Sequence, residues 1–187
     1  MADQVTNPVT AFPVDNNGVI LEMSPISQTG AGSATGTLVF GIGTESNNAL
    51  AAAQTFTTNA AGDLNNSTFG GKTVQAFLDS GSNAYFFADG TLGLCSGSYS
   101  GFYCPSTGQT RTVTLVGLNG VSAGADVGIM NAASLFANSS DFAFNDLGGD
   151  IGASGSFDLG LPFFYGRYVY VGFDQTANGG QQPYVGY

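Results

Sequence analysis

Short apolar runs bounded by Gly, Asn, Ser or Pro recur along the whole chain. They alternate with polar residues or stay apolar for only a few positions, which is typical of strands joined by turns. The 29 glycines are too many for a helical protein and fit a fold with many turns. The pattern predicts a mainly β fold, with strands near residues 19–23, 35–42, 55–58, 73–78, 85–87, 110–118, 126–130 and 168–173.

Few segments indicate helix. We expect short helices at 131–136, where Asn131 can act as the N-cap, and around 162–165. Residues 49–54 fit a helix or a strand equally well, and the apolar ending at 183–187 fits a final strand docked on the sheet.

The chain shows no internal repeat, and 187 residues are enough for one domain with a real core. The Gly/Ala/Ser-rich stretch at 28–35 is the weakest point. We therefore predict an N-terminal segment over 1–30, holding a strand and a linker, followed by one β domain over 31–187.

Charge excludes several functions. Only 9% of the residues are charged, against roughly 25% in typical soluble domains. Three basic residues against 13 acidic ones give a net charge of −10, so no nucleic-acid partner is expected.

No apolar run reaches 18 residues, so no membrane span is expected. The composition is typical of an exported bacterial protein, periplasmic or extracellular, whose signal peptide is absent from this chain.

The cysteine and histidine counts narrow the chemistry. Cys95 and Cys104 lie close together in a Gly/Ser-rich segment, which favours a local disulfide in an oxidising compartment. The alternative is two free thiols. Because the chain has no histidine, no zinc site is expected and neither Ser-His-Asp nor Cys-His catalysis is possible. Any hydrolysis must use carboxylates, and no cofactor is expected.

One such carboxylate ends a predicted strand. An apolar run leads into Asp79-Ser80-Gly81-Ser82, and a second apolar run follows. This is the form of an aspartic-peptidase catalytic loop, although Asp-Ser-Gly also occurs in ordinary turns. Gly81 would let the backbone approach the carboxylate, while Ser80 and Ser82 could donate hydrogen bonds that hold it ionised. Asp15 lacks this spacing and is interpreted as a turn residue.

A second segment, 157–174, resembles the closing segment of a pepsin-type lobe. The resemblance implies that Gly160 lies on a strand that supports the Asp79 loop in a ψ-shaped arrangement. Arg167 would be the structural base of this segment, or would bind a substrate carboxylate. Tyr85 and Phe87 are candidates for lining a substrate cleft, although an aromatic strand also fits the core.

Separate blocks at 36–50, 76–83, 101–105 and 160–167 resemble the bacterial DUF3443 family, over roughly residues 5–187. Together with the two segments above, this resemblance implies the C-terminal lobe of a pepsin-like, or retropepsin-like, aspartic peptidase. Leu161 departs from the pattern, because pepsins have an acidic residue there.

Two alternative functions are compatible with the single Asp79 loop. A carboxylate dyad activates water with two aspartates that share a proton, and this chain has one such loop. In the first interpretation, Asp79 pairs with its counterpart across a homodimer or with a second lobe, and the site hydrolyses peptide bonds without a metal. In the second, the chain is a non-catalytic exported β domain used for binding or structure.

Overall fold

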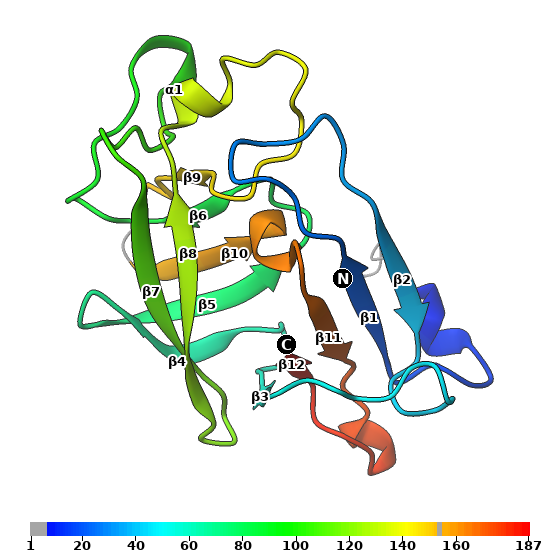
Figure 1. Cartoon of the computed structure of the whole chain (residues 1–187). Helices are drawn as coiled ribbons and strands as arrows, with labels where there is room; N and C mark the ends of the chain where they lie inside the picture. Colours follow the sequence, from blue (N-terminus) through cyan, green and yellow to red (C-terminus); the bar gives the residue numbers. More distant parts are fainter. Residues whose placement is uncertain (1–6, 153–154) are drawn as a thin grey trace, which may run out of the picture.

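The computed structural model describes residues 7–152 and 155–187. Two sheets hold the strands and wrap around a common core, nearly closing a barrel (Figure 1). The helices are short: η1 (Pro8–Ala11), η2 (Gly97–Tyr99), α1 (Ala132–Leu135), η3 (Leu161–Phe164) and η4 (Thr176–Asn178). The predicted mainly β class is therefore confirmed.

The first sheet has five strands, and every neighbouring pair is antiparallel. Its order is β2 (Gly36–Phe40), β1 (Gly18–Met23), β11 (Tyr168–Gly172), β12 (Tyr184–Gly186) and β3 (Thr55–Thr57). Strand β1 thus lies between β2 and β11, strands that are far apart in the sequence. Residues 1–6 lie outside the described residues, and the domain boundary near residue 30 stays a prediction.

The second sheet has seven strands. Its order is β8 (Ser122–Ile129), β7 (Gln109–Val116), β4 (Leu64–Phe69), β5 (Lys72–Asp79), β10 (Ser156–Gly160), β6 (Tyr85–Phe87) and β9 (Gly148–Gly149). Strand β10 lies between β5 and β6, parallel to the first and antiparallel to the second (Figure 1). A late segment of the chain therefore separates two strands that follow each other in sequence.

The main core lies between the two sheets and is rich in aromatic rings. Phe87 and Phe157 stack with ring centroids 4.6 Å apart and an interplanar angle of 8°. Phe69 packs edge-on against both rings. Phe87 of β6 and Phe157 of β10 are neighbours across the sheet. Ring packing as well as hydrogen bonding therefore fixes the position of β6 relative to β10.

The predicted strands and helices are confirmed with small shifts at their ends. Asn131 caps α1, where its side-chain oxygen accepts a hydrogen bond from the Ser134 N–H at 3.1 Å. The apolar ending forms β12, while residues 49–54 form neither helix nor strand. The pattern did not predict β4, β9 or β10. In β4 the register with β5 shifts between Leu64 and Ser67, which breaks the period of two.

Asp15 is a turn residue, as expected from the sequence. Its φ of 59° lies in the left-handed region, and its carboxylate accepts a hydrogen bond from the Thr44 hydroxyl. An aspartate tolerates this conformation better than most side chains do.

Cys95 and Cys104 form a disulfide, which confirms the predicted pairing and excludes two free thiols. The bond closes a loop between β6 and β7. No helix within the described residues is long and apolar enough to cross a membrane.

Replacing both cysteines with alanine is expected to lower the free energy of unfolding by about 2–3 kcal/mol, because the unfolded chain regains the entropy of a short closed loop. Urea unfolding of the double variant and the oxidised wild type measures the difference. Wild type unfolded in a reducing buffer serves as the control and should match the variant. A difference below about 0.5 kcal/mol would contradict the expectation.

Candidate functional site

Asp79 is the last residue of β5, where the chain leaves the sheet. Gly160, the last residue of β10, is its partner in the parallel ladder between these strands. The expected adjacency of the Asp79 loop and Gly160 is therefore present. It depends on β10 passing between β5 and β6.

The Asp79 carboxylate is held by the loop that follows it. Its Oδ1 accepts a hydrogen bond from the Gly81 N–H at 2.8 Å, and its Oδ2 lies 3.0 Å from Ser82 Oγ. Ser80 was expected to donate as well, but its side chain is exposed and forms no hydrogen bond to Asp79. In such an aspartate turn the groups two and three residues later reach back, so the intervening side chain is left outside.

Two glycines allow this loop to close. A Cβ atom at Gly81 would lie 3.0 Å from Asp79 Oδ1, so glycine permits the close approach expected from the sequence. At Gly160 the restriction is far stronger, because a Cβ would lie 2.0 Å from the Ala84 carbonyl oxygen. The next residue, Leu161, donates its N–H to the Ser82 carbonyl at 2.7 Å. The backbone of β10 and that of the loop are therefore in direct contact.

A second carboxylate lies against this loop and was not selected from the sequence. Asp158 Oδ2 is 2.6 Å from Ser82 Oγ, so one hydroxyl contacts both aspartates. Asp158 is 5% exposed, and its Oδ1 has no hydrogen-bond partner among the described residues. Burial raises its pKa from 3.8 to about 6, opposed by the Ser82 hydrogen bond and assisted by the negative charge of Asp79.

A signal for Asp158 does exist in the sequence. It is the one charged residue in the apolar run from Phe157 to Phe164, two positions before Gly160. A charged group at such a position must find a polar partner, because leaving it unpaired in the interior is costly.

Tyr85 and Phe87 do not line a cleft, which corrects that expectation. They are 3% and 0% exposed and belong to the main core. Residues alternate between the two faces of a strand, so both side chains of β6 point to the same side, and this side is the core. The alternative placement of this strand in the core is the one observed.

Arg167 supports the closing segment. It donates a hydrogen bond from Nη1 to the Phe163 carbonyl at 2.7 Å, and its guanidinium lies 4.4 Å from the centre of the Phe163 ring. It also lines an open cleft of about 620 Å³ together with Tyr168 and Tyr170. Asp79 is not among the residues that line this cleft. Among the described residues, no group of three or more His, Cys, Asp or Glu is arranged to hold a metal ion.

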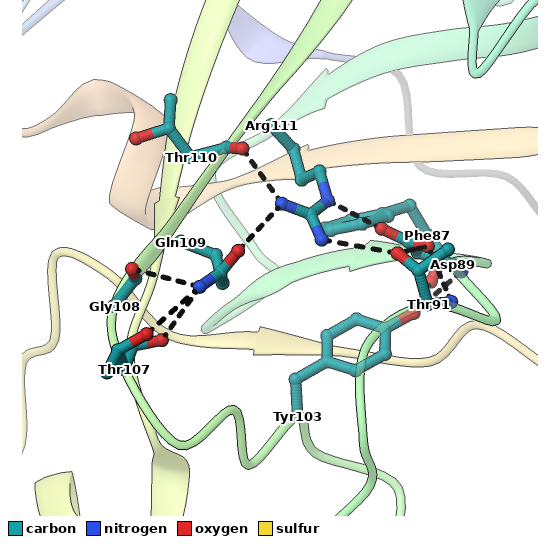
Figure 2. Close-up of polar contacts among 9 residues, drawn as sticks. All are labelled: Phe87, Asp89, Thr91, Tyr103, Thr107, Gly108, Gln109, Thr110 and Arg111. Atoms are coloured by element: carbon teal, nitrogen blue, oxygen red, sulfur yellow. Dashed lines mark hydrogen bonds and ion pairs between the residues drawn. The ribbon is translucent and has the colours of Figure 1, made fainter.

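A separate polar cluster joins the loop after β6 to strand β7 (Figure 2). Arg111 Nε donates to Asp89 Oδ2 at 2.6 Å, and Thr91 donates twice to Asp89 Oδ1. Tyr103 accepts a hydrogen bond from the Asp89 N–H and donates to the Phe87 carbonyl. Burial raises the pKa of Asp89, but the Thr91 and Arg111 contacts outweigh it and lower that pKa overall.

Arg111→Met is expected to lower the free energy of unfolding at neutral pH by about 1–2 kcal/mol, because Asp89 is left charged and half-buried without its cation. The lowered pKa of Asp89 means that this stabilisation is present above the ordinary carboxyl pKa and is lost as pH falls through the folded value. Urea unfolding at neutral and acidic pH measures both effects.

Lys72→Met is the matched control, since Lys72 is exposed and forms no ion pair within the described residues. It should change stability by less than about 0.5 kcal/mol. Equal effects of the two substitutions would mean that the Arg111–Asp89 contact contributes nothing specific.

Comparison with known proteins identifies one family. A family model described as "Protein of unknown function (DUF3443)" matches residues 1–187. Comparison with curated proteins and with solved structures gives no match. Because the family model matches the chain from its first residue to its last, the chain belongs to the DUF3443 family.

Proposed function

We propose that this chain is an aspartic-peptidase-like domain of the pepsin-lobe type, in which Asp79 provides one half of a two-carboxylate hydrolytic site. The observation that carries the proposal is the position of β10 between β5 and β6, which sets Gly160 beside Asp79. This arrangement holds a carboxylate by two hydrogen bonds at the end of an interior strand of the sheet. A hydrolytic carboxylate needs such fixed placement next to its water and substrate.

The second carboxylate comes from outside the described residues of this chain. Asp158 is unsuitable because it is buried behind Ser82, whereas Asp79 is half-exposed. Asp79 of a second copy, in a homodimer, or an equivalent aspartate of a second lobe would complete the dyad. One carboxylate then takes a proton from water as general base, and the other protonates the scissile carbonyl as general acid. No metal or cofactor takes part.

The substrate class is an extended peptide. A peptide bound across a dimer cleft by strand-like hydrogen bonds would present one carbonyl carbon to the shared water.

A disulfide and the absence of a membrane-spanning helix in the described residues are consistent with a location in the periplasm or outside the cell.

The second candidate is a non-catalytic exported β domain used for binding or structure. The observation that favours it is that Asp158, the other carboxylate at this loop, is buried, and one accessible aspartate alone does not activate water in this mechanism. A monomer with a solvated Asp79 would fit this function.

Cleavage of unstructured protein substrates by the purified chain tests the proposal. We expect activity below neutral pH that rises more than linearly with protein concentration, because a dimer forms the site. Asp79→Asn should reduce it by at least the 10²–10⁴-fold that general acid–base groups typically contribute. Glu45→Gln, at an exposed carboxylate outside the loop, is the matched control and should retain activity.

Sedimentation of the same preparations measures the oligomeric state. A strictly monomeric chain that cleaves nothing between about pH 3 and 6 would contradict the homodimer form of the proposal, and the pH range follows known carboxylate dyads. Activity that survives Asp79→Asn in a folded protein would contradict the role of Asp79 itself.

A further inference from the structure

The Ser82 hydroxyl has one proton but lies within hydrogen-bond distance of two carboxyl groups. Its Oγ lies 3.0 Å from Asp79 Oδ2 and 2.6 Å from Asp158 Oδ2, and both distances are those of hydrogen bonds. A serine hydroxyl has one proton to donate, although it can accept through its lone pairs. If both carboxyl groups were ionised, one contact would therefore bring two unprotonated oxygens together. A second proton must lie on one of the aspartates.

The surroundings identify Asp158 as the protonated one. In the two ladders its partners are Phe77 of β5 and Phe86 of β6, both apolar. Its Oδ1 has no hydrogen-bond partner among the described residues, whereas Asp79 Oδ1 accepts the Gly81 N–H. The negative charge of Asp79 also acts on Asp158. Burial next to a like charge favours the neutral acid.

We propose that Asp158 is a positioning residue: in its neutral form it donates a proton to Ser82 Oγ, and Ser82 in turn donates its own proton to Asp79. The chain Asp158–Ser82–Asp79 then fixes both oxygens of the Asp79 carboxylate, one through Gly81 and one through Ser82. The catalytic meaning of this chain rests on the proposed function of Asp79. The hydrogen-bond chain itself does not.

The arrangement depends on pH. The raised pKa of Asp158, about 6, places its loss of a proton in the mildly acidic range. Once Asp158 is ionised, two carboxylates compete for the single Ser82 proton, and Asp158 is the closer acceptor. Asp79 then loses the donor to its Oδ2. Any hydrolysis that depends on a fixed Asp79 carboxylate should therefore decline above this range.

Carboxyl carbon NMR of the isolated, ¹³C-labelled chain tests the inference without an activity assay. In a titration from about pH 4 to 8, the Asp158 Cγ signal should have a midpoint near 6. The Asp79 Cγ signal should show a step at the same midpoint, because Ser82 changes its acceptor there. An Asp158 midpoint near the usual carboxyl value of about 4 would overturn the proposal.

Variants separate the hydrogen bond from the charge. Ser82→Ala should remove at least half of the Asp79 step, while Ser82→Thr, which keeps the hydroxyl, should retain it. Ser80→Ala is the matched control on the neighbouring exposed residue and should also retain it. Asp158→Asn keeps a donor toward Ser82 at every pH and should remove the step. A full-sized step in a folded Ser82→Ala protein would show that charge alone couples the two groups, and would overturn the inference.

Failure of the two proposals can be told apart. An inactive chain with the coupled titration would contradict the homodimer form of the peptidase proposal and support the hydrogen-bond chain. An active chain without the coupled titration would support the peptidase proposal and contradict the hydrogen-bond chain. If the chain is active, Asp158→Asn should extend activity toward neutral pH relative to wild type, which a purely structural role would not produce.

Discussion

Gly160→Ala is expected to lower the free energy of unfolding by more than about 4 kcal/mol, or to prevent folding altogether. The added Cβ would lie 2.0 Å from the Ala84 carbonyl oxygen and 2.9 Å from the Ser82 carbonyl oxygen. Both are backbone atoms, so no side chain can rotate away to relieve the clash. Strand β10 would have to leave its place between β5 and β6. Soluble yield, far-ultraviolet circular dichroism and urea unfolding measure the effect.

Gly90→Ala is the matched control, because a Cβ there meets no atom within 4 Å. Its stability should stay within about 0.5 kcal/mol of wild type. If Gly160→Ala were tolerated equally well, the register that sets Gly160 beside Asp79 would be wrong. The basis of the proposed function would fail with it.

The sequence was sufficient to predict the local features of the site. Asp79, Gly81 and Ser82 lie within four consecutive residues, so turn chemistry alone indicates their mutual hydrogen bonds. The disulfide is local in the same sense, with a separation of 9 residues. Placing Gly160 beside Asp79 required more than periodicity. It depended on resemblance to a known arrangement, because no local pattern predicts a strand inserted between two others.

Contacts between distant residues were not predictable from the pattern. Ser82 and Asp158 are 76 residues apart, and neither residue type specifies the other as its partner. The Arg111–Asp89 pair joins strand β7 to the loop after β6 in the same way. Tyr85 and Phe87 show the reverse problem, since an aromatic strand beside a candidate catalytic loop fits both a cleft and a core. The placement in the core is decided by the pairing of β6 with β10, which sets the ring of Phe87 on that of Phe157.

The effect of Asp158→Asn on the free energy of unfolding is expected to be more stabilising at neutral pH than in acid, by about 3 kcal/mol. The folded pKa of Asp158 is raised from 3.8 to about 6, so between these values the native state binds more protons than the unfolded chain. Stability contributed by Asp158 is therefore complete below about pH 4 and falls as pH rises to about 6. An amide of the same shape has no proton to lose, and this decline disappears.

Urea unfolding of wild type and the Asp158→Asn variant between about pH 4 and 8 measures this difference. Other groups also titrate: burial raises the pKa of Asp146, which acts in the same direction, and Asp89 acts in the opposite one. Both remain in the variant, so subtraction of the two curves isolates Asp158. Parallel curves would mean that the pKa of Asp158 is the same in the folded and the unfolded protein, so that Asp158 is ionised in the folded protein above about pH 4. In that case Ser82 could not hold two carboxylates with one proton, and the contact between Ser82 and Asp158 would have to open.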